Sequence, residues 1–182
     1  MIRLFVALQI PDEIRTKIIE LRKQILPEGK NLRWEPKEKI HLTLKFIGDV
    51  EKQKIEDIKS IISFVENYKK FGLSLTKFGL FFNRHVPKIL WMGLSENENL
   101  MTLVNELNLK LKDIDIPAEN RKFKSHLTLL RIKNNFPESL IDKFENFNIP
   151  ETSFICDTIS LMESRLYPSG SEYSTIKNYE LK

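Results

Sequence analysis

The chain has 182 residues, of which 41% are hydrophobic and 30% are charged, a balance that is typical of a folded globular protein and excludes intrinsic disorder. The formal net charge of +4 is a modest basic excess, which is compatible with a polyanionic partner and does not by itself demonstrate one. The single cysteine, Cys156, excludes an internal disulfide framework and a cysteine-rich metal site.

In the first half of the chain, apolar periodicity and proline positions predict strands that alternate with helices. Ile14, Ile18 and Leu21 recur at helical spacing, and Pro27 ends that helix. The predicted elements are a strand over residues 2–8, this helix, a short strand over 32–34, a strand over 39–47, a helix over 51–68 and a strand over 73–82. Residues 83–87 are polar and end in proline, which is typical of an exposed loop.

The second half repeats this order. A buried strand over residues 89–94 precedes a helix, for which Ser95 is the expected N-cap, and residues 124–132 form the next strand. The remaining predicted elements are a helix over 137–144, strands over 152–161 and 173–181, and a turn at 168–170 between these two strands. Since the order strand, helix, strand occurs twice, the sequence indicates an internal duplication.

One four-residue word supports the duplication and carries chemical groups. His41-Leu42-Thr43-Leu44 returns as His126-Leu127-Thr128-Leu129 in corresponding strands, and the chain has only 3 histidines in all. Side chains alternate between the faces of a strand, so each histidine should share a face with its threonine while the leucines enter a core. Two such faces opposite one another would make a site.

We therefore expect an α+β protein of two similar lobes, each a mainly antiparallel sheet with helices on its outer face. The whole chain, 1–182, is predicted to be a single domain made of these two pseudo-symmetric lobes. No run approaches the roughly 18 apolar residues that a membrane span requires, and the first residues do not resemble a signal peptide. A cytoplasmic protein is expected.

The two histidines and two threonines suit a displacement at phosphorus. Imidazole titrates near neutral pH, so one neutral and one protonated histidine form a base and an acid. Nucleophile and leaving group lie on opposite sides of the phosphorus, and two facing histidines satisfy that geometry. The hydroxyls of Thr43 and Thr128 could donate hydrogen bonds to a phosphate oxygen. A phosphodiester is the natural substrate, and a strained cyclic one is the easiest.

Other interpretations of these residues compete with catalysis. A single histidine in a strand is usually structural, whereas two at matching places in a duplicated unit favour function. Zinc ligation is disfavoured, because two histidines are too few and no acidic residue accompanies either one in its strand. Lys45, on the predicted face of His41, could reach a phosphate, and His85 is expected to be a solvated loop residue. Some aromatic residues could stack on a base, although such side chains are more often core: Trp34, Phe81, Phe82 and, most clearly core, Trp91.

Taken together, the two words resemble the paired H-x-T-x signature of the two-histidine (2H) phosphoesterase superfamily. Within it, the chain is most similar to the RNA 2′,3′-cyclic phosphodiesterases, also named 2′-5′ RNA ligases. The resemblance covers nearly the whole chain, and the further residues that support it are 3–8, 33–34, 46–48, 90–94, Phe123 and Arg131.

The resemblance implies a bilobal fold with the active cleft between the lobes, and hydrolysis of a terminal 2′,3′-cyclic phosphate to a 2′-phosphate without metal or cofactor. It implies that His41 is the proton donor and His126 the proton acceptor, which the near-symmetric sequence alone cannot decide. Thr43, Thr128 and Arg131 map to phosphate-binding residues. Arg131 lies an odd number of positions from His126, so strict alternation puts it on the opposite face of the strand. It can reach the cleft if the strand bulges or ends before it, or if it extends from the rim of the cleft. If none of these holds, its role is structural.

The implied partners are RNA ends or nucleotides that carry a 2′,3′-cyclic phosphate. No membrane and no obligatory protein partner are implied, and a monomer is expected. Formation of a 2′-5′ linkage is the reverse of a related transesterification, so the same residues permit it. Two alternatives stay open: a module that binds RNA ends or a nucleotide without turnover, and a 2H phosphodiesterase for a cyclic phosphate on a nucleotide-derived metabolite.

Overall fold

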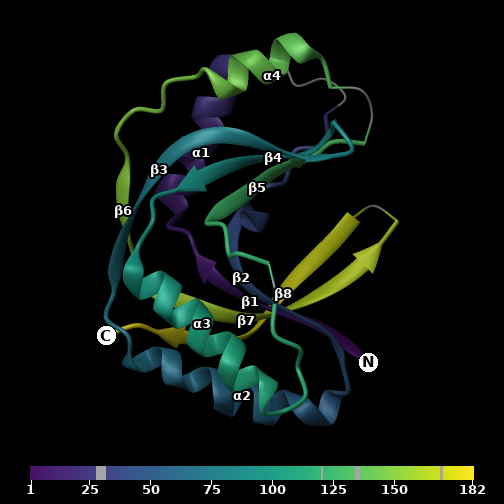
Figure 1. Cartoon of the computed structure of the whole chain (residues 1–182), viewed down its shortest axis with the longest axis vertical. Coiled ribbons are helices and arrows are strands. Elements are labelled where there is room, and N and C mark those ends of the chain that lie inside the picture. Colours follow the sequence, from purple (N-terminus) through teal and green to yellow (C-terminus); the bar gives the residue numbers. More distant parts are fainter. Residues whose placement is uncertain (28–31, 120, 134–135, 169) are drawn as a thin grey trace.

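Two antiparallel sheets of four strands each form the frame of the described chain (Figure 1), which a computed structural model defines for residues 1–27, 32–119, 121–133, 136–168 and 170–182. The first sheet has the order β2 (His41–Val50), β1 (Ile2–Gln9), β7 (Thr158–Tyr167) and β8 (Gly170–Glu180). The second has the order β5 (His126–Arg131), β4 (Val86–Leu94), β3 (Phe71–Asn83) and β6 (Ser153–Cys156). The predicted α+β class with two mainly antiparallel sheets is confirmed.

Helices cover the outer sides of the two sheets (Figure 1). At the end that holds β1, β2 and β7 lie α2 (Ile55–Ile62) and α3 (Glu98–Lys112), and at the end that holds β3 to β5 lie α1 (Asp12–Ile25) and α4 (Glu138–Glu145). Short 3₁₀ helices are η1 (Lys37–Lys39), η2 (Lys52–Lys54) and η3 (Ser63–Asn67). The helices bury one apolar side, as Ile18 in α1 and Leu107 in α3 show, and burial of each such side chain stabilises the fold by about 1.5–3 kcal/mol. In the described ranges, no helix is both long and apolar enough to cross a membrane.

The helix predicted over residues 51–68 is wrong in its extent, because the structure divides this stretch into η2, α2 and η3. The hydroxyl of Ser63 donates to the carbonyl oxygen of Ser60 at 2.6 Å, just where α2 ends. A serine that bonds its own backbone in this way competes with the helical ladder, and a tighter 3₁₀ turn follows. The N-cap of α3 is also not Ser95: Asn97 accepts from the amide of Leu100 at 3.1 Å.

The single strand predicted over residues 152–161 is two strands of different sheets. β6 pairs with β3, whereas β7 pairs with β1, and the chain crosses from one sheet to the other at Asp157. The burial pattern explains the break: Phe154 and Cys156 are buried before it, and Ile159 and Leu161 after it. The buried apolar positions change from even to odd numbers, which one regular strand cannot accommodate because its side chains alternate strictly.

Two short connections also differ from prediction. The loop expected over 83–87 is a two-residue turn, since β3 reaches Asn83 and β4 begins at Val86. Arg84 and His85 have φ of 47° and 65°, the left-handed backbone that suits a tight hairpin. The short strand expected over 32–34 is limited to one bridge, between Trp34 and Leu130. Ser169 of the predicted turn at 168–170 lies outside the described residues.

Candidate active site

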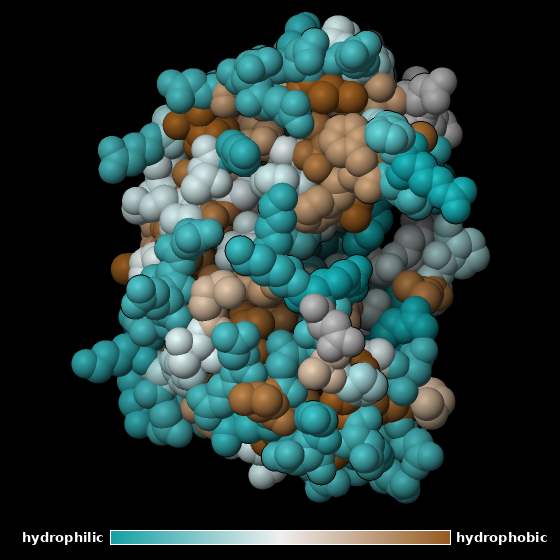
Figure 2. All heavy atoms as spheres, viewed as in Figure 1, coloured by the Kyte–Doolittle hydropathy of each residue, from teal (hydrophilic) through white to brown (hydrophobic). Residues whose placement is uncertain are grey.

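The two histidine words meet because each lies on an edge strand. β2 is the edge of the first sheet and β5 the edge of the second, and these two strands contact one another. Between the two halves the surface is hollowed, on the right of the view in Figure 2. The sheet order therefore brings together two words that are far apart in sequence.

The same irregularity occurs in both histidine strands. Ala7 pairs with Thr43 and Val6 with Lys45, which leaves Leu44 without a partner in β1. Likewise, β4 pairs with Thr128 and then with Leu130, which leaves Leu129 without one. Each strand thus carries a β-bulge directly after its threonine, and the residue after the bulge changes face.

The bulges place the side chains that follow them. Leu44 and Lys45 are both buried, and so are Leu129 and Leu130, so the next residue in each strand returns to the face of the histidine. In β5 that residue is Arg131, whereas the corresponding residue in β2 is Phe46. The bulge therefore puts Arg131 on the histidine face despite its odd spacing.

Lys45 does not lie on the His41 face, so that part of the sequence interpretation is wrong. Its side chain is only 4% exposed, and Nζ donates to the carbonyl oxygen of Pro117 at 2.5 Å. Burial lowers the pKa of Lys45, partly opposed by the charge of Glu119. The bulge at Leu44 is the physical reason, because it turns Lys45 away from the site.

His41 is held between aromatic rings. Its imidazole stacks on Phe5 with 5.1 Å between centroids, and Tyr173 meets it edge-on at 5.4 Å. Nε2 lies 3.2 Å from Oγ1 of Thr43, so the two side chains contact one another on the same face of β2. Burial lowers the pKa of His41 to about 4; a hydrogen bond to the Lys39 backbone opposes this effect, and the charge of Arg131 adds to it. At neutral pH this imidazole is therefore uncharged.

His126 has a different surrounding. Nδ1 lies 2.7 Å from the carbonyl oxygen of Lys124, and since a carbonyl only accepts, Nδ1 carries the proton and Nε2 of the neutral ring has the free lone pair. Phe81 meets the imidazole edge-on at 4.8 Å, and Trp91 does so at 6.4 Å. Burial also lowers the pKa of His126, with the charges of Lys124 and Arg131 adding to it.

Trp91 forms the floor beside His126. It is 4% exposed, but it is absent from the apolar core that the described residues form, because it lies on the histidine face of β4. A Cβ at Gly79 would collide with its ring, and one at Gly93 would lie 3.1 Å from it. Two neighbouring glycines thus let the indole lie flat across the sheet. The expected burial of Trp91 is confirmed, and its ring lies on the histidine face of the sheet.

Arg131 reaches both histidines electrostatically. Its positive charge lowers the pKa of His41 and of His126, although the two belong to different sheets. Its side chain is 57% exposed, and Nε lies 3.3 Å from Oε1 of Glu35. The backbone amide of Glu35 donates to the carbonyl oxygen of the bulge residue Leu129 at 2.8 Å, which fixes the carboxylate beside the arginine.

The remaining candidates lie elsewhere. Trp34 packs against Phe144 at 6.1 Å, with the guanidinium of Arg22 4.3 Å from its ring, so it belongs to the helical layer. Phe82 is exposed near the hairpin turn that holds His85. Within the described ranges, no group of three or more His, Cys, Asp or Glu side chains could hold a metal ion.

Three residues of the site were not predicted to lie there. Phe5 and Tyr173 enclose His41, and only the pairing of β1 and β8 with their neighbours brings them there. The position of Tyr173 is reinforced by Lys39, whose Nζ donates to the carbonyl oxygen of Ser171 at 2.5 Å. Lys124 did carry a signal, since it precedes His126 by two residues and so shares its face.

The chain is similar to known proteins over nearly its whole length. The family model described as LigT like Phosphoesterase matches residues 8–91 and 93–173. Two curated relatives named RNA 2′,3′-cyclic phosphodiesterase are 31% identical (Archaeoglobus fulgidus, 98% of this chain and 99% of the relative) and 30% identical (Methanocaldococcus jannaschii, 97% and 99%). The crystal structure of Escherichia coli LigT complexed with 3′-AMP aligns with a TM-score of 0.78 at 26% identity, over 100% of this chain and 98% of that one. TT0787 of Thermus thermophilus has the same fold, with a TM-score of 0.82 at 24% identity, over 98% and 97%.

Proposed function

Because the chain belongs to the LigT like Phosphoesterase family, it is a two-histidine phosphoesterase, and we propose that it hydrolyses the 2′,3′-cyclic phosphate at RNA ends or on nucleotides to a 2′-phosphate. The observation that carries this proposal is the meeting of two edge strands that each present an imidazole, with one arginine charge acting on both. The names of the curated relatives supply the substrate class.

In the proposed mechanism, His126 is the proton acceptor. Its Nδ1–H is held by the Lys124 carbonyl, which leaves Nε2 to take a proton from the attacking water. The charges of Lys124 and Arg131 both favour the neutral ring, as a general base requires. As Nε2 takes the proton, the water oxygen forms its bond to phosphorus.

His41 is the proton donor on the opposite side. The charges of both Lys124 and Arg131 oppose protonation of His126, whereas only the charge of Arg131 opposes protonation of His41. Burial keeps the imidazole of His41 neutral in the free protein, and the negative phosphate of a bound substrate counteracts this effect. As the bond from phosphorus to the ribose 3′-oxygen breaks, the imidazolium gives its proton to that oxygen. The product keeps the phosphate on the 2′-oxygen.

Thr43, Thr128 and Arg131 are the proposed phosphate ligands. Each threonine lies two residues after its histidine on the same face, and each is only partly buried. Their hydroxyls donate to the non-bridging oxygens, while the guanidinium neutralises the charge that grows on them. If a 5′-hydroxyl takes the place of water, the same groups form a 2′-5′ linkage, which is the related reverse chemistry.

The deciding experiment uses an oligonucleotide with a 2′,3′-cyclic phosphate, incubated with the protein in EDTA. We expect turnover to a 2′-phosphate, a bell-shaped pH dependence of kcat/KM, and a loss of at least about a hundredfold for His41→Ala or His126→Ala. Recovery of unchanged, tightly bound RNA would instead support a binding module. A 3′-phosphate product would exclude the proposed cleavage of the 3′ bond, and abolition by EDTA would exclude the metal-free route.

A further inference from the structure

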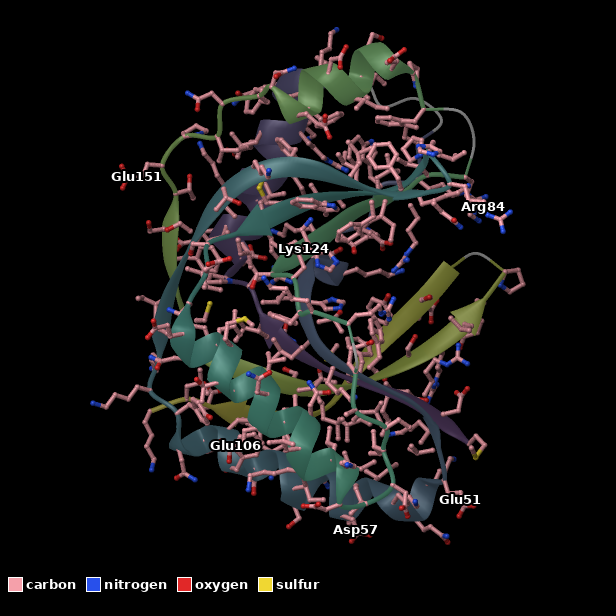
Figure 3. The ribbon with its side chains drawn as sticks, in the orientation of Figure 1. Glu51, Asp57, Arg84, Glu106, Lys124 and Glu151 are labelled. Atoms are coloured by element: carbon pink, nitrogen blue, oxygen red, sulfur yellow. The ribbon has the colours of Figure 1, made fainter. Side chains whose placement is uncertain are left out.

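Lys124 occupies an unusual place on the wall that holds His126. Its Nζ lies 4.3 Å from the centre of the Trp91 ring and 4.9 Å from that of Phe81. Phe81 is also the ring that meets His126, at 4.8 Å. Figure 3 shows Lys124 between the two sheets, on the chain that leads into β5. The ammonium and the imidazole therefore stand side by side on one aromatic floor.

The ammonium of Lys124 is accessible and uncompensated by an acid. The residue is exposed, and no carboxylate lies within ion-pair distance of it in the described part of the chain. Its charge acts on the neighbouring histidine, whose protonated form it disfavours. An aromatic floor holds a cation by electrostatic attraction to the ring faces without neutralising it, as a carboxylate would. The position therefore keeps a positive charge available for an anionic ligand.

The indole beneath the ammonium is a closed floor. Trp91 is 4% exposed, and its Nε1–H is buried with no hydrogen-bond acceptor among the described residues. Because this N–H is covered, the donor over the ring that a ligand from solvent can reach is the exposed ammonium of Lys124. An anionic oxygen that enters here, beside His126, therefore meets the lysine as its donor.

From this geometry we infer that Lys124, above Trp91, binds a second phosphate of the substrate, namely the phosphodiester on the 5′ side of the nucleotide that carries the cyclic phosphate. The inference rests on the proposed function. Nζ of Lys124 and the imidazole of His126 lie 4.9 Å and 4.8 Å from the centre of the same Phe81 ring, so a single ribose with its two phosphates can bridge them. A lysine ammonium is a point charge well suited to such a contact. The site therefore prefers the end of an RNA chain to a free cyclic mononucleotide.

The test compares three substrates with the same terminal nucleotide. The first is a nucleoside 2′,3′-cyclic phosphate with a free 5′-hydroxyl, the second a dinucleotide with a natural linkage, and the third that dinucleotide with an uncharged methylphosphonate linkage. For the natural protein we expect kcat/KM to be about tenfold higher on the charged dinucleotide than on the other two. The methylphosphonate separates the contribution of the charge from that of the second base.

The variants then assign this preference to Lys124. Lys124→Gln should lower the ratio of kcat/KM on the charged dinucleotide to kcat/KM on the methylphosphonate dinucleotide from about tenfold to about one, chiefly through KM; any effect of the lost charge on His126 is common to all three substrates and leaves this ratio unchanged. Lys124→Arg should restore it, and the slope of log kcat/KM against log salt should fall by about 0.7 in Lys124→Gln, the value for one phosphate of a single strand. Lys110→Gln is the matched control, since its Nζ also lies over an aromatic ring, 5.2 Å from that of Phe64, but on the helical layer.

The outcomes that contradict this inference differ from those that contradict the proposed function. Equal rates on charged and methylphosphonate dinucleotides with the natural protein would overturn the second-phosphate site while leaving the hydrolase standing. An equal loss on all three substrates in Lys124→Gln would also overturn it, because the residue would then act on His126 alone. No turnover of any of the three by the natural protein would instead remove the proposed function.

Discussion

His41 should make the protein sensitive to mild acid. Its pKa falls from 6.5 in an exposed histidine to about 4 in the folded protein, so the folded state resists a proton that the unfolded chain accepts. Between these two pKa values the unfolded state binds one proton more, and stability must fall as the pH falls. The stabilising contribution is therefore complete above about pH 6.5 and is lost progressively toward pH 4.

The magnitude follows from the same two pKa values. A tenfold change in proton affinity is worth about 1.4 kcal/mol, so acidification from pH 7 to pH 5 should lower the free energy of unfolding by about 2 kcal/mol through His41 alone. Most carboxyl groups stay ionised over this interval, which limits their contribution. His126 acts in the same direction, because burial also lowers its pKa.

A variant isolates the effect of His41. Urea unfolding of the natural protein and of His41→Asn, at both pH values, gives the change in the free energy of unfolding for each. The natural protein should lose about 2 kcal/mol more than the variant, whatever the variant costs at pH 7, because asparagine does not titrate. Equal losses in the two proteins, or an NMR titration of His41 with a midpoint near 6.5, would refute the reasoning.

Three further substitutions test the site from other sides. Arg131→Gln should raise the pKa of both site histidines, which NMR titration measures, and should raise KM for a phosphodiester by about tenfold. Unchanged histidine titrations would mean that the guanidinium is remote from them. Lys45→Met should leave kcat/KM within about twofold. It should lower the free energy of unfolding by about 1 kcal/mol, because the Pro117 carbonyl loses its donor. A large loss of kcat/KM would show that Lys45 contributes to the reaction. Gly79→Ala should displace the Trp91 ring and cost about 1–3 kcal/mol by denaturation, and a stability equal to that of the natural protein would contradict the close packing.

Much of the frame was predictable because periodicity and the repeated word agree. The alternation around His41 and His126 placed each histidine with its threonine, and the repeat of strand, helix and strand indicated two sheets of similar build. The crossing at Asp157 was also visible in principle, since Phe154 and Cys156 are even-numbered and Ile159 is odd-numbered. A strand whose apolar positions change parity should be interpreted as a strand that breaks.

Other features could not be predicted from local pattern. A bulge depends on how a strand pairs with its neighbour, so nothing within 41–50 indicates that Leu44 has no partner in β1. The same holds for Tyr173, which reaches His41 only through the register of β7 with β8. Both depend on contacts between segments distant in sequence. The sequence could therefore identify the imidazoles without identifying what surrounds them.

The surroundings also support the two different roles that we propose for a symmetric pair of words. The words are identical through the bulge, and the residues that return to the histidine face after it differ, with Phe46 in one strand and Arg131 in the other. The arginine thus lies on the strand of His126, which also has a lysine two residues before its histidine. Both histidines contact aromatic rings, whereas the positive charges of Lys124 and Arg131 gather on the wall of His126. In the proposed mechanism, this wall favours a neutral base, and His41 becomes an acid through the negative charge of the substrate. The double variant Phe46→Arg with Arg131→Phe exchanges the residues at these two positions and moves positive charge toward His41. This charge should disfavour the protonated form of His41 and lower kcat by about tenfold or more. An unchanged kcat would show that these two residues do not set the roles of the histidines.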